Sequence, residues 1–237
     1  MNKGLLVLLA IFFLCSGCST DIKQDLLNYA EKKYDKQFDV LAVTVGQYDL
    51  LMGKQASSIT LTNKDDNFCF KVIYYRNEYS DDYLNAYYGT LLVKGIVNSL
   101  VNKDLKITDV SYIGYLDSNY ITDYIAEENP QFNKKDHLNI VIAFKSPEIF
   151  MDSDFEKVLQ TLYNDLYEST FEYLLQLLCI KSECYEVIPS KLKQVKYKNA
   201  NVILNDFDNI LKYSVEYGSI PEYTPSIENV KQCIIKY

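Results

Sequence analysis

The sequence predicts an α+β fold in which helices pack on mostly antiparallel sheets. Helical and strand-like segments follow one another along the 237 residues without the regular strand–helix–strand rhythm of a parallel sheet. Three strand-like segments also come early in the chain, joined by loops that are too short for the crossovers that parallel strands need. An apolar content of 48% is ordinary for a globular protein and allows one domain or two small ones.

The first lobe is expected to cover residues 18–117. A helix is predicted over 21–35, because Asp21 and Gln24 form a capping-box pattern and apolar residues recur on one face. A second helix is predicted over 80–102, with Ser80 as its N-cap. The predicted strands, in which apolar and polar residues alternate, cover residues 38–48, 57–62, 67–76 and 107–116.

The second lobe, residues 118–237, is expected to contain one long helix over 154–179. Ser153 and Glu156 form another capping-box pattern, and a wide apolar stripe follows them. The width of this stripe favours burial against a sheet over a coiled coil. The shorter elements predicted around the long helix are helices over 121–128 and 206–213 and strands over 137–144 and 230–235.

Residues 1–17 have the pattern of a removable leader. Lys3 supplies a positive start, residues 5–14 are an unbroken apolar run, and Cys18 follows two small residues, Ser16 and Gly17. The run is shorter than the roughly 20 apolar residues that a spanning helix needs. This pattern resembles the signal of bacterial lipoproteins. Where that family carries Leu, three residues before the modified Cys, this chain has Cys15.

The resemblance implies that Cys18 receives a diacylglyceryl group and becomes the first mature residue. Acyl chains such as palmitate would then hold the mature chain on the extracytoplasmic face of the cell membrane. The alternative is an ordinary secretory signal that happens to contain a Cys. Residues 10–17, AIFFLCSG, also resemble the apolar peptides that some Gram-positive bacteria release from lipoprotein signals as mating pheromones.

Residues 28–76 carry a second resemblance. Their opening, YAEKKYDKQFDV, resembles the helix-to-strand start of small uncharacterised Gram-positive surface lipoproteins. Such proteins are often built as a helix packed on an antiparallel sheet, somewhat like cystatins. The use of Lys almost to the exclusion of Arg is also typical of low-GC Gram-positive bacteria, although this is an association and not a physical argument.

The acidic charge argues against nucleic acid as a partner. Without residues 1–17 the chain loses only the charge of Lys3, so the formal net charge of −8 becomes −9. A chain this acidic has no electrostatic attraction for phosphate backbones, and anionic lipid surfaces repel it. The expected partners are therefore the membrane, through the lipid anchor, and a protein, peptide or envelope ligand.

Four further cysteines follow Cys18. They allow three pairings, and the short loop between Cys179 and Cys184 makes these two the candidate disulfide. Unpaired buried thiols are the alternative. No metal site and no cofactor are expected, because the mature chain has no CxxC pair and its single histidine, His137, stands alone.

No catalytic signature appears in the sequence. A phosphate-binding Gly-rich loop, HExxH and GxSxG are all missing, and His137 is expected to be a solvated histidine at a strand start and not a base. The preferred hypothesis is a non-enzymatic binding module, with Tyr-rich segments as a candidate binding surface. The alternative is a cell-envelope hydrolase that uses paired carboxylates. The close acidic pairs are Asp65-Asp66, Asp81-Asp82, Glu127-Glu128 and Asp152 with Asp154.

Overall fold

The protein folds into two compact units that divide between Tyr83 and Leu84. The structure, a computed structural model, describes residues 22–49, 54–63, 68–102, 105, 107, 109–117, 136–167, 172–194, 210–219 and 225–237. We expected the division between residues 117 and 118. It falls earlier because the strand that ends at Asp117 pairs with a strand of the second unit and not with the first sheet.

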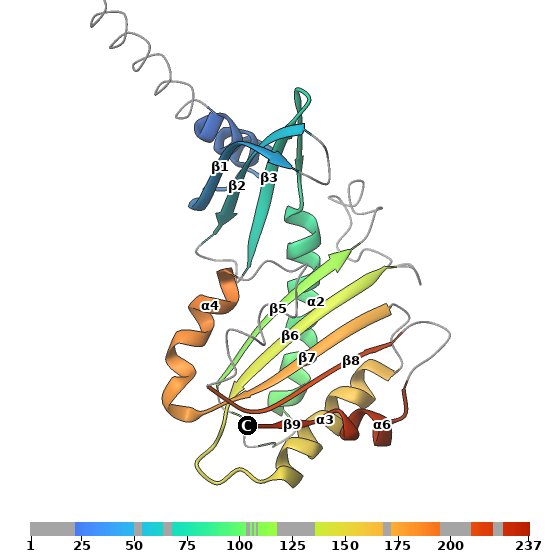
Figure 1. Cartoon of the computed structure of the whole chain (residues 1–237). Coiled ribbons are helices and arrows are strands. Elements are labelled where there is room, and N and C mark those ends of the chain that lie inside the picture. Colours follow the sequence, from blue (N-terminus) through green and yellow to red (C-terminus); the bar gives the residue numbers. More distant parts are fainter. Residues whose placement is uncertain are drawn as a thin grey trace, which may run out of the picture. The chain divides into compact units, whose positions relative to one another are not determined.

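The first unit is a helix over residues 22–34 packed on a four-stranded antiparallel sheet (Figure 1). This confirms the predicted arrangement. The strands lie in sequence order and are β1 (Asp39–Asp49), β2 (Lys54–Thr62), β3 (Cys69–Tyr75) and β4 (Glu78–Asp81). The core is formed where fully buried Leu26 and Ala30 of the helix meet inward-facing side chains of β2 and β3. The buried sheet residues include Ile59, Leu61, Phe70 and Val72.

A tight turn joins β3 to β4. Its two residues, Arg76 and Asn77, both have positive φ angles, 51° and 64°, as a type I′ hairpin turn requires. Ser80 was expected to cap a helix, but it lies in β4 opposite Ile73, and helix α2 (Tyr83–Asn102) begins three residues later. The pairing of β3 with β4 therefore extends further along the chain than the sequence indicated.

The second unit is built on a five-stranded sheet in the order β5-β6-β7-β8-β9. Only β6 and β7 are parallel, and the other neighbouring strands are antiparallel. After α2 the elements are β5 (Val110–Asp117), β6 (His137–Lys145), α3 (Asp152–Tyr167), β7 (Glu172–Ile180), the 3-10 helix η2 (Ser182–Val187), α4 (Ile188–Gln194), β8 (Leu211–Ser219), α6 (Ile227–Gln232) and β9 (Ile235–Lys236). The α+β class with mostly antiparallel sheets is confirmed in both units.

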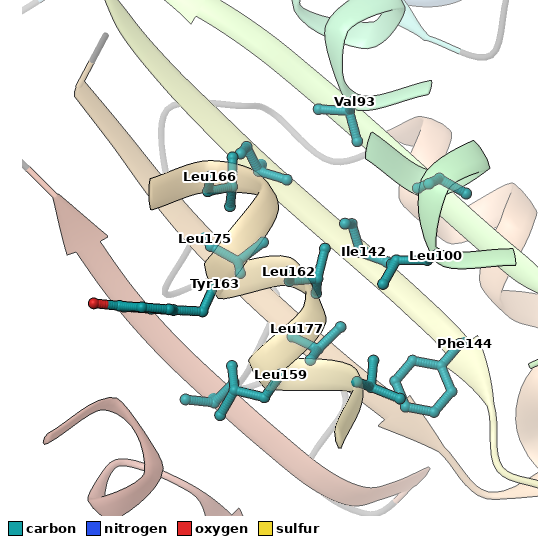
Figure 2. Packing of buried hydrophobic residues seen from close by; sticks show 14 of the residues in the cluster. Val93, Leu100, Ile142, Phe144, Leu159, Leu162, Tyr163, Leu166, Leu175 and Leu177 are labelled. Carbon is teal, nitrogen blue, oxygen red and sulfur yellow. The ribbon is translucent and has the colours of Figure 1, made fainter. Parts of the chain in front are cut away.

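Helices cover both faces of the second sheet. The main core lies between the sheet and helices α2 and α3, where Figure 2 shows Val93 and Leu100 of α2 with Leu159 and Leu162 of α3 over β6 and β7. A smaller cluster covers the opposite face, where η2 and α4 contribute Tyr185, Ile188 and Leu192. Because β6 and β7 are buried on both faces, they read as nearly continuous apolar runs.

The predicted long helix over 154–179 is wrong in its second half. Helix α3 ends at Tyr167, and residues 172–180 form β7, which runs parallel to β6. An apolar run in a strand that is buried on both faces has no alternation to distinguish it from a buried helix. Of the predicted helix over 206–213, residues 211–213 belong to β8, and residues 206–209 lie outside the described residues. The predicted strand over 230–235 gives way to α6 and β9. The predicted helix over 121–128 lies outside the described residues.

Among the described residues, no helix is both long enough and apolar enough to cross a membrane.

Helix α2 approaches β5 through two glycines. A methyl group added at Gly89 would lie 2.6 Å from the backbone of Tyr115, and one added at Gly114 would collide with the carbonyl of Gly89. Only residues without a Cβ allow the two backbones to come this close. The pair therefore sets the distance between α2 and the edge strand of the sheet.

We expect Gly89→Ala to lower the free energy of unfolding by about 2–3 kcal/mol, because the helix must move away from β5. The matched control is Gly95→Ala in the same helix, where no atom lies within 4 Å of the added methyl group. That control is expected to gain about 1 kcal/mol from helix propensity. Urea unfolding of both variants tests this, and equal effects at the two sites would contradict it.

Candidate functional site

The predicted site residues do not come together. Cys18 lies outside the described residues. The predicted disulfide is wrong, because all four described cysteines are free thiols. Cys179 packs into the main core on the α2–α3 side of the sheet, whereas Cys184 packs with the cluster on the opposite face. Burial raises the pKa of the Cys179 thiol to about 12, so this thiol is unreactive at neutral pH.

His137 stands at the start of β6, far from Cys179. Its Nδ1 atom lies 3.7 Å from Oε2 of Glu172, and both side chains are about one-third exposed. Cys179 is aligned with Phe144, seven residues further along β6 than His137. At about 3.3 Å per residue, this places the thiol roughly 23 Å from the imidazole. The two cannot form a Cys–His catalytic pair.

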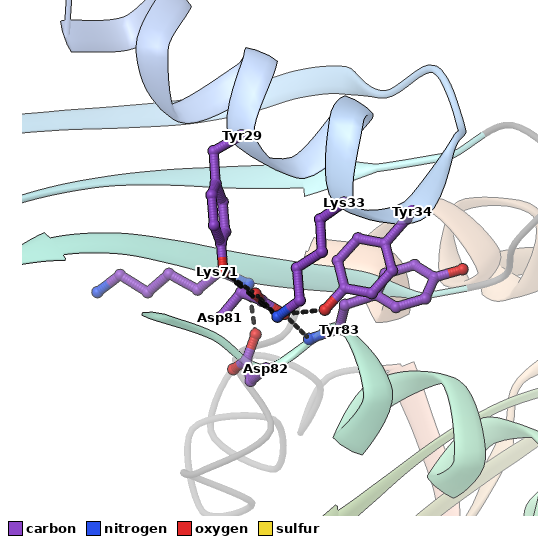
Figure 3. A network of polar contacts seen from close by, with 7 residues as sticks. All are labelled: Tyr29, Lys33, Tyr34, Lys71, Asp81, Asp82 and Tyr83. Carbon is purple, nitrogen blue, oxygen red and sulfur yellow. Dashed lines mark hydrogen bonds and ion pairs between the residues drawn. The ribbon is translucent and has the colours of Figure 1, made fainter. Parts of the chain in front are cut away.

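Two of the four acidic pairs, Asp65-Asp66 and Glu127-Glu128, lie outside the described residues. Asp81 of a third pair is buried, with 2% of its side chain exposed. Figure 3 shows the donors that surround it. The Asp81 carboxylate accepts hydrogen bonds from the Tyr34 hydroxyl (2.5 Å), Lys33 Nζ (2.8 Å), the Tyr29 hydroxyl (3.1 Å) and the backbone N–H of Tyr83 (3.2 Å).

These four donors fix the Asp81 carboxylate as a structural group. Three of them come from the helix over 22–34, so Asp81 ties that helix to β4. Burial and the hydrogen bond to Asp81 raise the pKa of the Tyr34 hydroxyl. The neighbouring Asp82 accepts from the backbone N–H of Lys71 at 2.5 Å. Both carboxylates of this pair therefore hold the fold together.

The fourth pair lies at the start of α3. Asp152 accepts a hydrogen bond from the Tyr213 hydroxyl at 2.7 Å and pairs with Lys236 Nζ. The bonds from Lys236 and Tyr213 lower the pKa of this carboxyl. Asp154 accepts from the backbone N–H of Met151 at 3.0 Å, as the third helical residue of a capping box does. These contacts join α3 to β8 and to the last strand.

One polar pair lies within an apolar part of the second sheet. Gln176 of β7 is 1% exposed and stands opposite Glu216 of β8. Its Nε2 donates to Glu216 Oε2 at 2.5 Å, whereas its Oε1 has no hydrogen-bond donor. Glu216 is half-buried, and among the described residues it forms no ion pair. An unsatisfied amide oxygen thus lies beside a carboxylate that lacks a cation.

The unsatisfied Oε1 of Gln176, beside a Glu216 carboxylate that has no cation among the described residues, makes this pair the candidate binding site. Leaving a buried acceptor unsatisfied costs about 1–3 kcal/mol, and a ligand that donates hydrogen bonds recovers part of that cost. Such unsatisfied groups are uncommon in folded proteins and call for an explanation. One signal of the site is present in the sequence, a lone Gln in the apolar run YLLQLLCI. Because this run was expected to be helical, the face of the sheet that carries the Gln was not predicted.

Comparisons with known proteins show the fold and nothing more specific. No family model matches the chain, and no curated protein matches it. The structure is similar to the crystal structure of a DUF5037 family protein from Ruminococcus gnavus ATCC 29149, with a TM-score of 0.55 and 13% sequence identity. The match covers 90% of this chain and 98% of that one. It therefore extends over more of the chain than either unit contains.

We expect Gln176→Leu to leave stability unchanged or to raise it by about 1 kcal/mol. The leucine removes the unsatisfied oxygen, and half-exposed Glu216 keeps water as a partner. Urea unfolding measures the effect. A loss above about 2 kcal/mol would mean that Gln176 is a structural residue and that the pair is not a binding site.

A second prediction concerns Tyr213. The hydrogen bond to Asp152, followed by burial, raises the pKa of its hydroxyl to about 12 from 10.0. Between these pH values the unfolded chain has lost a proton that the folded chain keeps, so stability falls as pH rises through this window. We expect Tyr213→Phe to show a shallower fall, by at most one proton. Urea unfolding from pH 9 to 12 tests this, and slopes that stay identical above pH 10 would contradict it.

Proposed function

We propose that this protein is a lipid-anchored lipoprotein on the extracytoplasmic face of the cell membrane. The observation that carries the proposal is the apolar run over 5–14 followed by Ser16, Gly17 and Cys18. Cleavage before Cys18 would remove none of the described elements, since the first helix starts at residue 22. The first buried side chain in the described chain is Leu26. The folded units are therefore compatible with a processed chain.

The anchor would supply most of the membrane affinity. Two or more acyl chains hold a protein stably, at about 0.8 kcal/mol for each buried CH₂ group. The mature net charge of −9 opposes adsorption of the whole molecule to anionic lipids. Attachment at one thiol thus keeps an acidic, folded chain at the surface.

We infer further that the anchored chain binds a protein, peptide or envelope component and does not catalyse a reaction. Gln176 and Glu216 support binding, because two acceptors on adjacent strands suit an amide, ammonium or guanidinium donor. The carboxylates of Asp81 and Asp152 are occupied by donors of the protein itself. The carboxylate hydrolase stays a prediction, and no contact among the described residues favours it.

We expect cells grown with labelled palmitate to label the wild-type chain but not Cys18→Ala. The thiol at this position is the acyl acceptor, so its removal leaves nothing to modify. The readout is the label on the immunoprecipitated protein, together with its partition between membrane and supernatant. The wild-type chain should be in the membrane fraction.

The matched control is Cys15→Leu. It removes a thiol from the same leader and places Leu where the lipoprotein family carries it. Labelling should be retained or increased. Label that persists in Cys18→Ala, or a wild-type chain that carries none, would reject lipid anchoring.

A further inference from the structure

The β3–β4 turn and the start of the helix over 22–34 lie at the same end of the first unit (Figure 1). Lys33, near the end of the helix, contacts Asp81, at the end of β4. One turn earlier in the helix, Tyr29 stacks on Tyr79 with ring centroids 4.8 Å apart. The helix and β4 therefore run in the same direction, both away from the turn, so the start of the helix lies at the end of the unit that carries Arg76.

This end carries aromatic and cationic side chains. Arg76 is exposed at the turn, and its guanidinium carbon lies 5.2 Å from the centre of the Tyr75 ring. Tyr79 is 38% exposed and its ring lies 4.9 Å from that of Tyr74. A positive φ costs a residue with a Cβ about 1–2 kcal/mol. The fold thus holds an arginine at a turn position that glycine or asparagine would occupy at lower cost.

The length of chain before the helix limits how far this end can be from the anchor. Cys18 precedes Ile22 by four residues, which span at most about 14 Å when fully extended. From Ile22 to Tyr29 the helix adds seven residues, or about 10 Å. A membrane-bound Cys18 would therefore keep the backbone of Tyr29, whose ring stacks on Tyr79 three residues from Arg76, within roughly 25 Å of the lipid attachment point.

We propose that the tip of the β3–β4 hairpin, with Tyr75, Arg76 and Tyr79, contacts the headgroup region of the membrane that holds the anchor. This inference rests on the proposed lipid anchoring. Tyrosine has an apolar ring and a polar tip and favours the membrane–water interface. Arginine donates bidentate hydrogen bonds to lipid phosphates.

The charges at this end predict the lipid dependence of the contact. Arg76 and Lys23 are exposed beside exposed Glu78 and Asp25, so the formal charges balance. Attraction to anionic lipid is therefore not the driving force, and the contact should form on zwitterionic phosphatidylcholine. It should also persist at about 0.15 M salt, where the Debye length is only about 8 Å.

The test attaches the mature chain to vesicles without acylation. A hexahistidine tag replaces Cys18 and binds a nickel-chelating lipid in phosphatidylcholine vesicles. Hydrogen exchange is then compared between tethered and free protein. We expect the amides of residues 74–79 to exchange about three- to tenfold more slowly when tethered.

The test variant combines Tyr75→Ser with Arg76→Gly. Glycine suits the positive φ of the turn, so the hairpin should still fold, and the protection on tethering should be lost. The matched control is Ile149→Ser, which removes an 83% exposed apolar residue from the second unit and should keep the protection.

Unchanged exchange at residues 74–79 in vesicle-bound wild-type protein would overturn the proposal, as would equal protection in the double variant. Because the tag supplies the attachment, a chain that is not acylated in cells leaves this result intact. Failure of lipid anchoring and failure of hairpin contact are thus separate outcomes.

Discussion

The carboxylate of Asp81 is the contact on which the first unit depends. Four hydrogen bonds converge on it, three of them from side chains of the helix over 22–34. Bonds to an ionised acceptor contribute about 1.5–3 kcal/mol, roughly twice a neutral bond. The network holds the helix on the β3–β4 side of the sheet, while the edge strand β1 keeps Leu41 and Val45 exposed. The position of the helix decides which end of the unit adjoins the proposed anchor.

The second unit depends on a different constraint, the crossover from β6 through α3 to β7. It makes the one parallel pair in an otherwise antiparallel sheet and puts α3 beside α2 on the same face. Among the described residues, η2 and α4 cover the opposite face with a smaller apolar cluster. Gln176 and Glu216 lie on that opposite face, since Leu178 and Ile180 of the same strand belong to the smaller cluster. The topology thus places the proposed binding pair on the face of the sheet that α2 and α3 do not cover.

The sequence predicted the first unit better than the second for a physical reason. Helix 22–34 and strands β1 to β3 each have a solvent-facing side. Apolar residues therefore recur in the sequence with the helical period of 3.6 or the strand period of 2, and these periods predicted the elements. β7 is buried on both faces, and its run from Tyr173 to Ile180 gave no period to separate a strand from a continuation of α3. Ser80 failed as a cap because hairpin pairing with Ile73, a tertiary contact, outweighed its local preference.

The candidate sites were less predictable than the fold. The lipid-anchor pattern is local in sequence, so residues 1–18 could be read directly. The Asp81 network joins residues 47 to 52 positions apart, and the partners of Gln176 follow from the register of β7 on β8. The Cys179–Cys184 pairing was wrong because a short separation in sequence says nothing about which face of a sheet each thiol occupies.

The most direct test of this account is the stability of Asp81→Asn, measured by urea unfolding with hydrogen exchange of the helix over 22–34. Loss of the charged acceptor should lower the free energy of unfolding of the first unit by about 2–3 kcal/mol and speed exchange in that helix. Asp25→Asn, an exposed acid on the same helix, should change stability by less than about 0.5 kcal/mol. If the two variants were equally stable, Asp81 would not hold the helix on the hairpin, and the placement of the turn beside the anchor would lose its basis.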